Sequence, residues 1–553
     1  MKRKNTIMMI LIITTLTVTG CGNINNRFFD VTTSLDSTNY ETSESDYYIP
    51  HINNNSKSEV AMEYNYNSMN DTIKGDMECE IYYPPSIELN TEEYNNIKEN
   101  SFINVSTQPL STFAIDVDTG SYTNFRRMVN DGYQLENIPS GAIRIEEMIN
   151  YFTYDFANKT TNDSEIFDVK YEIHDCPWNN KNKLLAINVQ AGDIEINTKG
   201  NNFVYLIDTS GSMSYDDAKG KLAIKSFKLL TDTLTEKDTV SIVTYAGNAE
   251  VLLEGCSGSN KREIKKVLND ISFEGYTNGG GGIIAAYQVA EDYFIDGGNN
   301  RVIVASDGDM NFGITSQSDL VDLIEEKKES GVFLTTLGYG SGNYSDANME
   351  SIANAGNGNY YYIDCEKEAE YVLVEKLKQS TITVAKDVKI QVEFNPTKIS
   401  SYRLLGYENR AMSADDFKND KKDGGETGAG QQVTVLYELE CSNTNKEIDL
   451  KYQGNRELTE AAQTNEILTL SLRYKHPNED KSLLEKFVIE DKETSISKDY
   501  KFVCGIAELS MVLTNSEYKG TSSLDNSYDF ISNNTKNDKR REECAELIDM
   551  INE

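Results

Sequence analysis

Histidine, paired cysteines and clustered basic residues are scarce in this sequence, and each shortage narrows the chemistry that it can support. Only three histidines occur among 553 residues, at positions 51, 174 and 476. A Ser-His-Asp triad or a zinc hydrolase needs at least one histidine at its site, and we interpret all three as surface residues. The eight cysteines include no CxxC pair, which argues against a zinc framework. We expect buried or free thiols, with one or two disulfides as the alternative in an exported protein.

Basic residues are also fewer than acidic residues. The chain has 53 Lys and Arg residues against 89 Asp and Glu, a formal net charge of −36. A polyphosphate is repelled by such a chain at long range, and nucleic-acid binding needs clustered Lys and Arg. The short basic cluster Lys539–Arg541 is flanked by acids. We therefore expect no nucleic-acid partner, whereas an acidic surface suits a protein that gathers divalent cations or stays soluble outside the cell.

Long apolar runs are missing except near the N-terminus. The stretch from Ile7 to Val18 follows three basic residues and is interrupted by threonines, so it is shorter than a membrane span and typical of a signal sequence. It ends in Val18-Thr19-Gly20-Cys21, which resembles a bacterial lipobox. The resemblance implies cleavage before Cys21 and lipid on Cys21. We then expect an exported protein on the outer face of the cell membrane, contacting the membrane through that lipid only; an ordinary signal peptide is the alternative.

Composition and periodicity divide the rest of the chain. From Gly22 to Gln108 it is rich in Asn, Ser, Thr and Tyr without a sustained period, which predicts a mostly disordered tether. From Phe203 onward, apolar runs typical of buried strands alternate with helical patterns. This alternation predicts an α/β domain with a doubly wound, mostly parallel sheet. The predicted division is a signal peptide (1–21), a tether (22–108), an N-terminal region (109–163), a β region (164–199), the α/β domain (200–380), a β-rich region (381–490) and a helical tail (491–553).

The two β regions on either side of the α/β domain predict a β-sandwich-like part. One hypothesis is that strands within 166–190 and 386–475 pair in one sheet. We expect a long loop from Asp415 to Gln432, and helices from Phe502 to Leu513 and from Arg540 to Ile551.

Oxygen-bearing side chains follow two of the expected parallel strands. One strand runs into Asp208-Thr209-Ser210-Gly211-Ser212, and a later strand ends in Ser306-Asp307-Gly308. Ligands of open parallel sheets collect at the carboxyl ends of strands, and Gly211 permits the tight turn that lets alternate side chains converge. A flexible loop carrying Thr277 lies between the two strands in sequence. Hydroxyl and carboxylate oxygens suit Mg²⁺, or Mn²⁺ or Ca²⁺.

These pieces, in this order, resemble the von Willebrand factor type A (VWA) domain, a Rossmann-like fold with a metal-ion-dependent adhesion site. The resemblance implies five metal-binding residues, namely Asp208, Ser210, Ser212, Thr277 and Asp307. It also implies that an Asp or Glu carboxylate of a protein partner completes the coordination. Two carboxylates roughly cancel the charge of a divalent cation, which leaves it able to accept one more anionic oxygen.

The wider chain, from about Ser111 to Ile531, resembles a bacterial lipoprotein family that carries the VWA domain between its own N- and C-terminal associated regions. The resemblance is carried by Phe113–Tyr122, Gly428-Ala429-Gly430 and Ser516–Gly520. The function of that family is poorly defined. Our first hypothesis is a surface lipoprotein, not an enzyme, that binds a protein ligand through the metal site. The alternatives are an envelope structural or assembly component whose flanking β regions make the contacts, and a hydrolase that uses metal-bound water but lacks an evident general base.

Three other motifs are set aside. Asp118-Thr119-Gly120 resembles an aspartic-protease loop, but that chemistry needs a second such loop, and the sequence has none. Asp116-Val117-Asp118 begins like a calcium loop, but Arg127 stands where the bidentate Glu of an EF-hand belongs. Gly279–Gly282 is not followed by the Lys-Ser/Thr of a phosphate loop.

Overall fold

The computed structural model describes residues 91–160, 164, 166–192, 199–214, 219–246, 248–273, 280–308, 317–442, 457–477, 479–492 and 494–552. The expected signal peptide, its lipidation residue Cys21 and most of the expected tether lie outside this part of the chain. Within the described residues, no helix combines the length and the apolar character needed to cross a membrane. The six cysteines in these residues are all free thiols.

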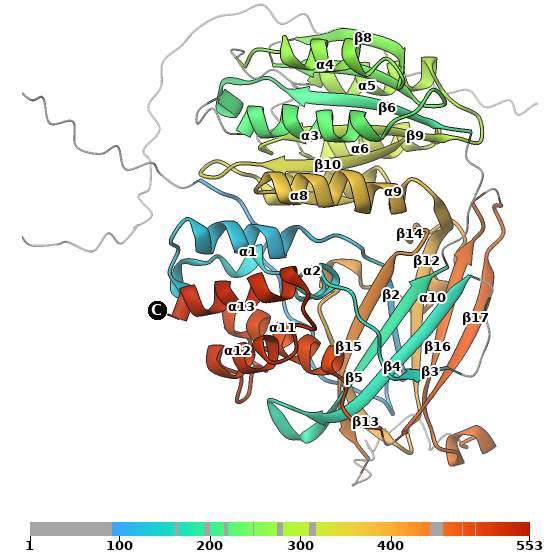
Figure 1. The fold of residues 1–553 in the computed structure, drawn as a ribbon. Coiled ribbons are helices and arrows are strands. Elements are labelled where there is room, and N and C mark those ends of the chain that lie inside the picture. The colour runs from blue at the N-terminus through green and yellow to red at the C-terminus, as the bar shows by residue number, and fades with distance from the viewer. Residues whose placement is uncertain are drawn as a thin grey trace, which may run out of the picture. The chain divides into compact units, whose positions relative to one another are not determined.

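A six-stranded sheet forms the centre of the α/β domain (Figure 1). All neighbouring strands pair in parallel except β7 and β8, which are antiparallel. The predicted doubly wound, mostly parallel fold is therefore confirmed. In spatial order the strands are β11 (Tyr360–Ile363), β10 (Phe333–Tyr339), β9 (Asn299–Ser306), β6 (Asn201–Asp208), β7 (Thr239–Tyr245) and β8 (Ala249–Ser257).

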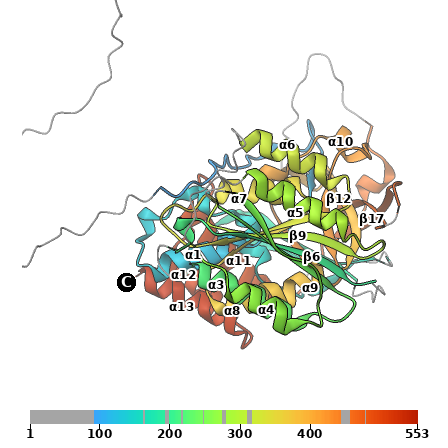
Figure 2. The same cartoon turned by 90° about the horizontal axis from the view of Figure 1, so that it is seen from above.

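Helices cover both faces of this sheet (Figure 2). Along β6, Phe203, Tyr205 and Ile207 belong to one apolar core and Val204 and Leu206 to the other, as the alternation of a strand buried on both faces requires. Each fully buried side chain of this kind contributes roughly 1.5–3 kcal/mol. The first core is covered by α3 (Lys219–Thr233), α4 (Lys261–Asn269), α8 (Glu366–Glu370), the π-helix η4 (Tyr371–Lys376) and α9 (Leu377–Ser380), and the second by α5 (Gly280–Asp292), α6 (Gln317–Lys328) and α7 (Asp346–Ala355).

Two antiparallel sheets form the β part, and they share one core to which Ile187 and Ile390 contribute from opposite sheets. Strands before and after the α/β domain do pair, with Gln190 opposite Gln432, so that hypothesis is confirmed. One sheet has the order β1 (Ile103–Asn104), β13 (Ile399–Leu405), β15 (Gln432–Cys441), β5 (Asn179–Ala191), β4 (Phe167–Cys176) and β3 (Asn158–Lys159). The other has the order β14 (Gly425–Gly428), β12 (Thr383–Phe394), β16 (Glu466–Lys475) and β17 (Leu483–Glu490), with β2 (Leu110–Ala114) paired to β12.

A helical part joins the first and last segments of the described chain. Phe125 and Phe152 share a core with Phe502 and Leu547, although more than 340 positions separate the two pairs in sequence. The expected helical tail is therefore confirmed, and it packs against the N-terminal helices. The helices are α1 (Gly120–Asn130), α2 (Ile145–Asn150), α11 (Lys498–Leu513), α12 (Leu524–Ser532) and α13 (Lys539–Asn552). Short helices elsewhere are η1 (Leu135–Asn137), η2 (Ser140–Ala142), η3 (Gly211–Ser214), η5 (Glu408–Arg410), α10 (Ala414–Lys418) and η6 (Glu460–Gln463).

Two expectations about irregular segments are wrong over the residues that the structure describes. The sequence predicts a disordered tether as far as Gln108, but Ile103–Asn104 pairs with β13 and Val105 is buried. The backbone groups of this polar stretch find partners in other segments, which composition does not reveal. The expected loop from Asp415 to Gln432 contains α10 and β14, because Ser413 and Asp416 form a capping box and Thr427 pairs with Ala385.

Candidate metal centre

The turn after β6 brings three predicted ligands together. Asp208 is fully buried at the end of the strand, and its Oδ1 accepts the backbone N–H of Ser210 at 2.9 Å. The chain then enters η3, and the hydroxyls of Ser210 and Ser212 lie 2.9 Å apart. The side chains at positions 208, 210 and 212 thus gather on one side of the turn, as their alternate spacing predicts.

Asp307 reaches the same edge of the sheet from the neighbouring strand β9. Ile207 is paired with Ala305, so Asp208 and Ser306 are adjacent, and the Ser306 hydroxyl donates to Asp208 Oδ2 at 2.9 Å. The Tyr245 hydroxyl of β7 donates to the same oxygen at 3.2 Å. Burial raises the pKa of Asp208 to about 6, and the negative charge of Asp307 adds to the rise. Two buried carboxylates in mutual repulsion, beside two hydroxyls, form a donor set that fits a hard divalent cation.

Two residues that sequence reasoning missed also lie at this edge. The Asn343 amide donates to Asp307 Oδ2 at 3.1 Å, and the Lys219 ammonium lies 3.9 Å from the same oxygen. Lys219 is almost fully buried and also donates to Asn343 Oδ1 and the Ser341 carbonyl, each at 3.1 Å. Lys219 could have been found from the sequence, because it begins the helix that follows the Asp208 turn. No local pattern marks Asn343.

The structure therefore gathers Asp208, Ser210, Ser212 and Asp307 at one edge of the sheet. Thr277 falls in the range 274–279, outside the described residues, and its part in the site stays a prediction. The bound cation also stays a prediction.

Another group of acids lies elsewhere, at the end of the second antiparallel sheet. Carboxylate oxygens of Asp387, Asp423 and Glu426 all lie within 4.8 Å of one another. Two of these acids already have cationic partners, since Lys475 pairs with Asp387 at 2.5 Å and Lys328 pairs with Asp423 at 2.7 Å. Burial, aided by the charges of Asp387 and Asp423, raises the pKa of Glu426 to about 8. The two lysines compensate most of the charge of this cluster, so we assign it no cation.

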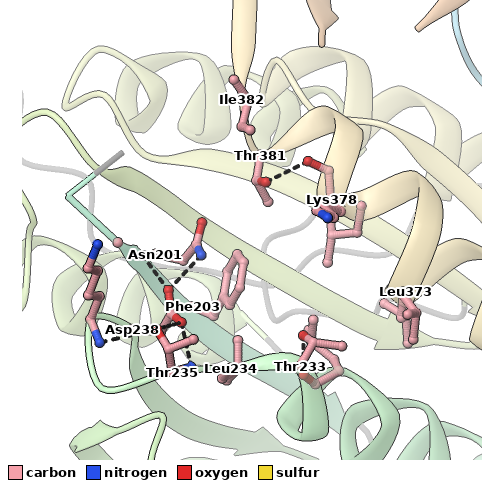
Figure 3. Close-up of a pocket in the computed structure, with 15 residues that line it drawn as sticks. Asn201, Phe203, Thr233, Leu234, Thr235, Asp238, Leu373, Lys378, Thr381 and Ile382 are labelled. Carbon is pink, nitrogen blue, oxygen red and sulfur yellow. Dashed lines mark hydrogen bonds between the residues drawn. The ribbon is translucent and has the colours of Figure 1, made fainter. Parts of the chain in front are cut away.

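A cavity of about 640 Å³ opens at the other end of β6. Figure 3 shows its lining, where Phe203, Leu234 and Leu373 supply apolar surface and Asp238 is bonded to Asn201. Asn201 begins β6 and Asp208 ends it, which places about 20 Å between cavity and carboxylate at the usual rise of a strand. The cavity is therefore separate from the candidate metal centre.

The fold and the Asp208 turn define a VWA domain protein. The model of the von Willebrand factor type A domain family matches residues 202–376. A second family model, described as von Willebrand factor, matches residues 88–186, and a third, described as the C-terminal part of uncharacterized protein YfbK, matches residues 379–553.

A curated relative covers most of the chain. Uncharacterized protein YfbK of Escherichia coli (strain K12) is 40% identical over 440 residues, which are 78% of this chain and 76% of the relative. The chain belongs to the YfbK family of VWA proteins.

Solved VWA structures are more distant. A von Willebrand factor type A protein from Catenulispora acidiphila has a TM-score of 0.40 and 16% identity, covering 69% of this chain and 90% of its own. The ArnB paralog VWA2 from Sulfolobus acidocaldarius has a TM-score of 0.35 and 16% identity, covering 69% of this chain and 97% of its own.

Proposed function

We propose that the protein is an exported lipoprotein, anchored through Cys21, that binds a protein ligand through a divalent cation held at the Asp208 edge. VWA domains commonly serve in protein interaction and metal-dependent adhesion, which supports this choice. The observation that carries the proposal is the convergence of two buried carboxylates, Asp208 and Asp307, with the hydroxyls of Ser210 and Ser212. Thr277 completes the proposed ligand set. Mg²⁺ is the cation we expect, with Mn²⁺ or Ca²⁺ as substitutes, and it would supply a Lewis-acidic position for an incoming anionic oxygen.

The positive charge of Lys219 affects which kind of ligand the metal-loaded site prefers. Two carboxylates and one ammonium leave the protein groups with a single net negative charge, so a bound divalent cation makes the site positive overall. A positive site favours the carboxylate of an Asp or Glu on the partner over a neutral oxygen. We propose a binding role and not a catalytic one, because both carboxylates described at this edge serve as cation ligands in the proposed site.

The test is affinity capture from envelope extracts with the exported chain as bait, in Mg²⁺ and in EDTA. Capture in Mg²⁺ that disappears in EDTA and in Asp208→Ala, but persists in the matched control Asp423→Asn, supports the proposal. Asp423 is a suitable control because it belongs to the separate, lysine-compensated cluster. Equal capture in EDTA contradicts metal-dependent binding and favours the alternative, an assembly component that uses its flanking β regions.

A further inference from the structure

The first described residues of the chain run alongside a loop of the α/β domain. We call Thr91–Asn95 the strap and Gly340–Asp346 the rim loop. The strap N–H groups of Thr91 and Glu93 donate to the carbonyls of Gly342 and Tyr344 at 2.7 and 2.9 Å. The rim loop returns a bond from the Asp346 N–H to the Glu93 carbonyl at 3.1 Å, and Glu93 forms a parallel bridge with Ser345. The strap thus acts as a short extra strand on the rim loop.

Glu92 fixes the strap in place. Its side chain is 1% exposed, and its Oε1 accepts the Gly342 N–H at 2.9 Å. The Arg127 guanidinium of α1 lies 3.0 Å from Oε1, and the Tyr94 hydroxyl donates to Oε2 at 2.8 Å. A buried carboxylate with an ionic partner and two further donors is held firmly, because each of these bonds is charge-assisted. Glu92 therefore ties the rim loop to the helical part of the protein.

The rim loop in turn contacts the candidate metal centre. Asn343 donates to Asp307 Oδ2 and accepts from Lys219, and the Ser345 N–H donates to the Asp307 carbonyl at 3.2 Å. Gly340 and Gly342 both have positive φ, at 90° and 85°. Glycines of this kind give the loop little rigidity of its own. Its position over Asp307 depends on contacts with neighbouring segments, which are Lys219, Tyr360 and Tyr362 within the α/β domain and the strap.

We propose that the strap sets the affinity of the Asp208 metal centre, with Glu92 as a positioning residue that acts through the rim loop and Asn343. This inference rests on the proposed metal site. The path runs from Glu92 through the Gly342 N–H to Asn343 and Asp307, so loss of the strap contacts should reach the proposed ligand Asp307. Partners that orient a metal ligand commonly change metal affinity by about 10- to 100-fold when they are removed.

The experiment is a Mn²⁺ titration of the exported chain, followed by the electron paramagnetic resonance signal of free Mn²⁺. Glu92→Ala should weaken Mn²⁺ binding about tenfold, with an unchanged helical circular-dichroism spectrum. Glu92→Gln, which keeps an oxygen for the Gly342 N–H, should restore most of the affinity. The matched control is Asp131→Asn, since Asp131 also pairs with Arg127, at 3.5 Å, and is half exposed. It should bind Mn²⁺ like the unmodified chain.

A double-mutant cycle shows whether Glu92 acts through Asn343 or merely destabilises the fold around the metal centre. Asn343→Ala should weaken Mn²⁺ binding as Glu92→Ala does, and the double variant should lose no more than the single ones, because both act on Asp307 through one contact. If Glu92→Ala fails to fold, Thr91→Pro replaces it in the cycle, since it deletes the N–H and the hydroxyl that both donate to the Gly342 carbonyl. Unchanged affinity, additive losses or an equal loss in Asp131→Asn overturns the inference while Asp208-dependent binding stands. If the unmodified chain binds no Mn²⁺, or binds it no better than Asp208→Ala does, the proposed function itself is overturned.

Discussion

The Ser306 hydroxyl donates a 2.9 Å hydrogen bond to Oδ2 of Asp208 across the paired ends of β9 and β6. The other oxygen of this carboxylate, Oδ1, accepts the backbone N–H of Ser210 in the turn. Both oxygens of Asp208 are therefore held at the edge of the sheet. The two strands that carry the acids are therefore joined at the level of the proposed cation. A contact behind a metal ligand of this kind usually matters for affinity as well as for stability.

Ser306→Ala tests this support. We expect Mg²⁺ affinity to fall about tenfold, because Asp208 Oδ2 keeps only the longer bond from Tyr245. Isothermal titration calorimetry measures the change. Ser241→Ala is the control, since Ser241 is equally buried on β7 of the same sheet but accepts from the Gly255 N–H. If both variants bind Mg²⁺ like the unmodified chain, the Ser306 bond has no part in the site.

Lys219→Met should change metal and ligand binding in opposite directions. Removing an ammonium 3.9 Å from Asp307 Oδ2 makes the site more negative, so Mg²⁺ should bind roughly tenfold more tightly. The loaded site then carries less positive charge, and an acidic ligand should bind more weakly. Calorimetry with Mg²⁺ and with the captured partner measures both effects. Lys228→Met on the same helix, where the side chain bonds Asn269, should change neither.

Glu426 should make stability fall as pH rises. Its pKa is raised from 4.5 to about 8, so between these values the folded chain holds a proton that the unfolded chain releases. The free energy of unfolding then decreases from about pH 4.5 to about pH 8. Glu426→Gln should melt at a higher temperature than the unmodified chain at pH 8.5, and the difference should vanish near pH 4. Thermal melts across this range provide the measurement, with the exposed Glu457→Gln as control. A difference that is the same at both pH values would refute the assignment.

Arg126 should be a major stabilising link between the helical part and the α/β domain. It lies on α1 with its side chain 5% exposed, and its guanidinium pairs with Asp364 at 2.6 Å and with Glu368 at 2.8 Å. Arg126→Met leaves two buried carboxylates without a cation, which should cost about 3–5 kcal/mol in the free energy of unfolding. Urea denaturation measures the loss. The control Lys225→Met breaks an exposed pair with Glu366 and should cost no more than about 1 kcal/mol; equal losses would contradict this ranking.

The local parts of the fold and site were predictable from the sequence. Strand β6 is apolar on both faces, so it stands out as a run, and Asp208, Ser210 and Ser212 follow it within one turn. Asp307 follows another such run. What the sequence could not predict depends on contacts between distant segments. Asn343 approaches Asp307 because two strands are adjacent, and the strap is polar but pairs through its backbone, so composition marks it as disordered. Helix α12 buries only Ser527 and Ile531, and the Ser527 hydroxyl bonds the Gly505 carbonyl of α11, a contact that no local pattern reveals.

The most direct test of the central claim is calorimetric titration of the full chain with Mg²⁺, beside Asp208→Ala and the control Asp423→Asn. We predict one binding site in the unmodified chain, the same site in Asp423→Asn, and no binding in Asp208→Ala, with helical content and melting behaviour retained. Binding of Mg²⁺ by Asp208→Ala with the affinity of the unmodified chain would contradict the account.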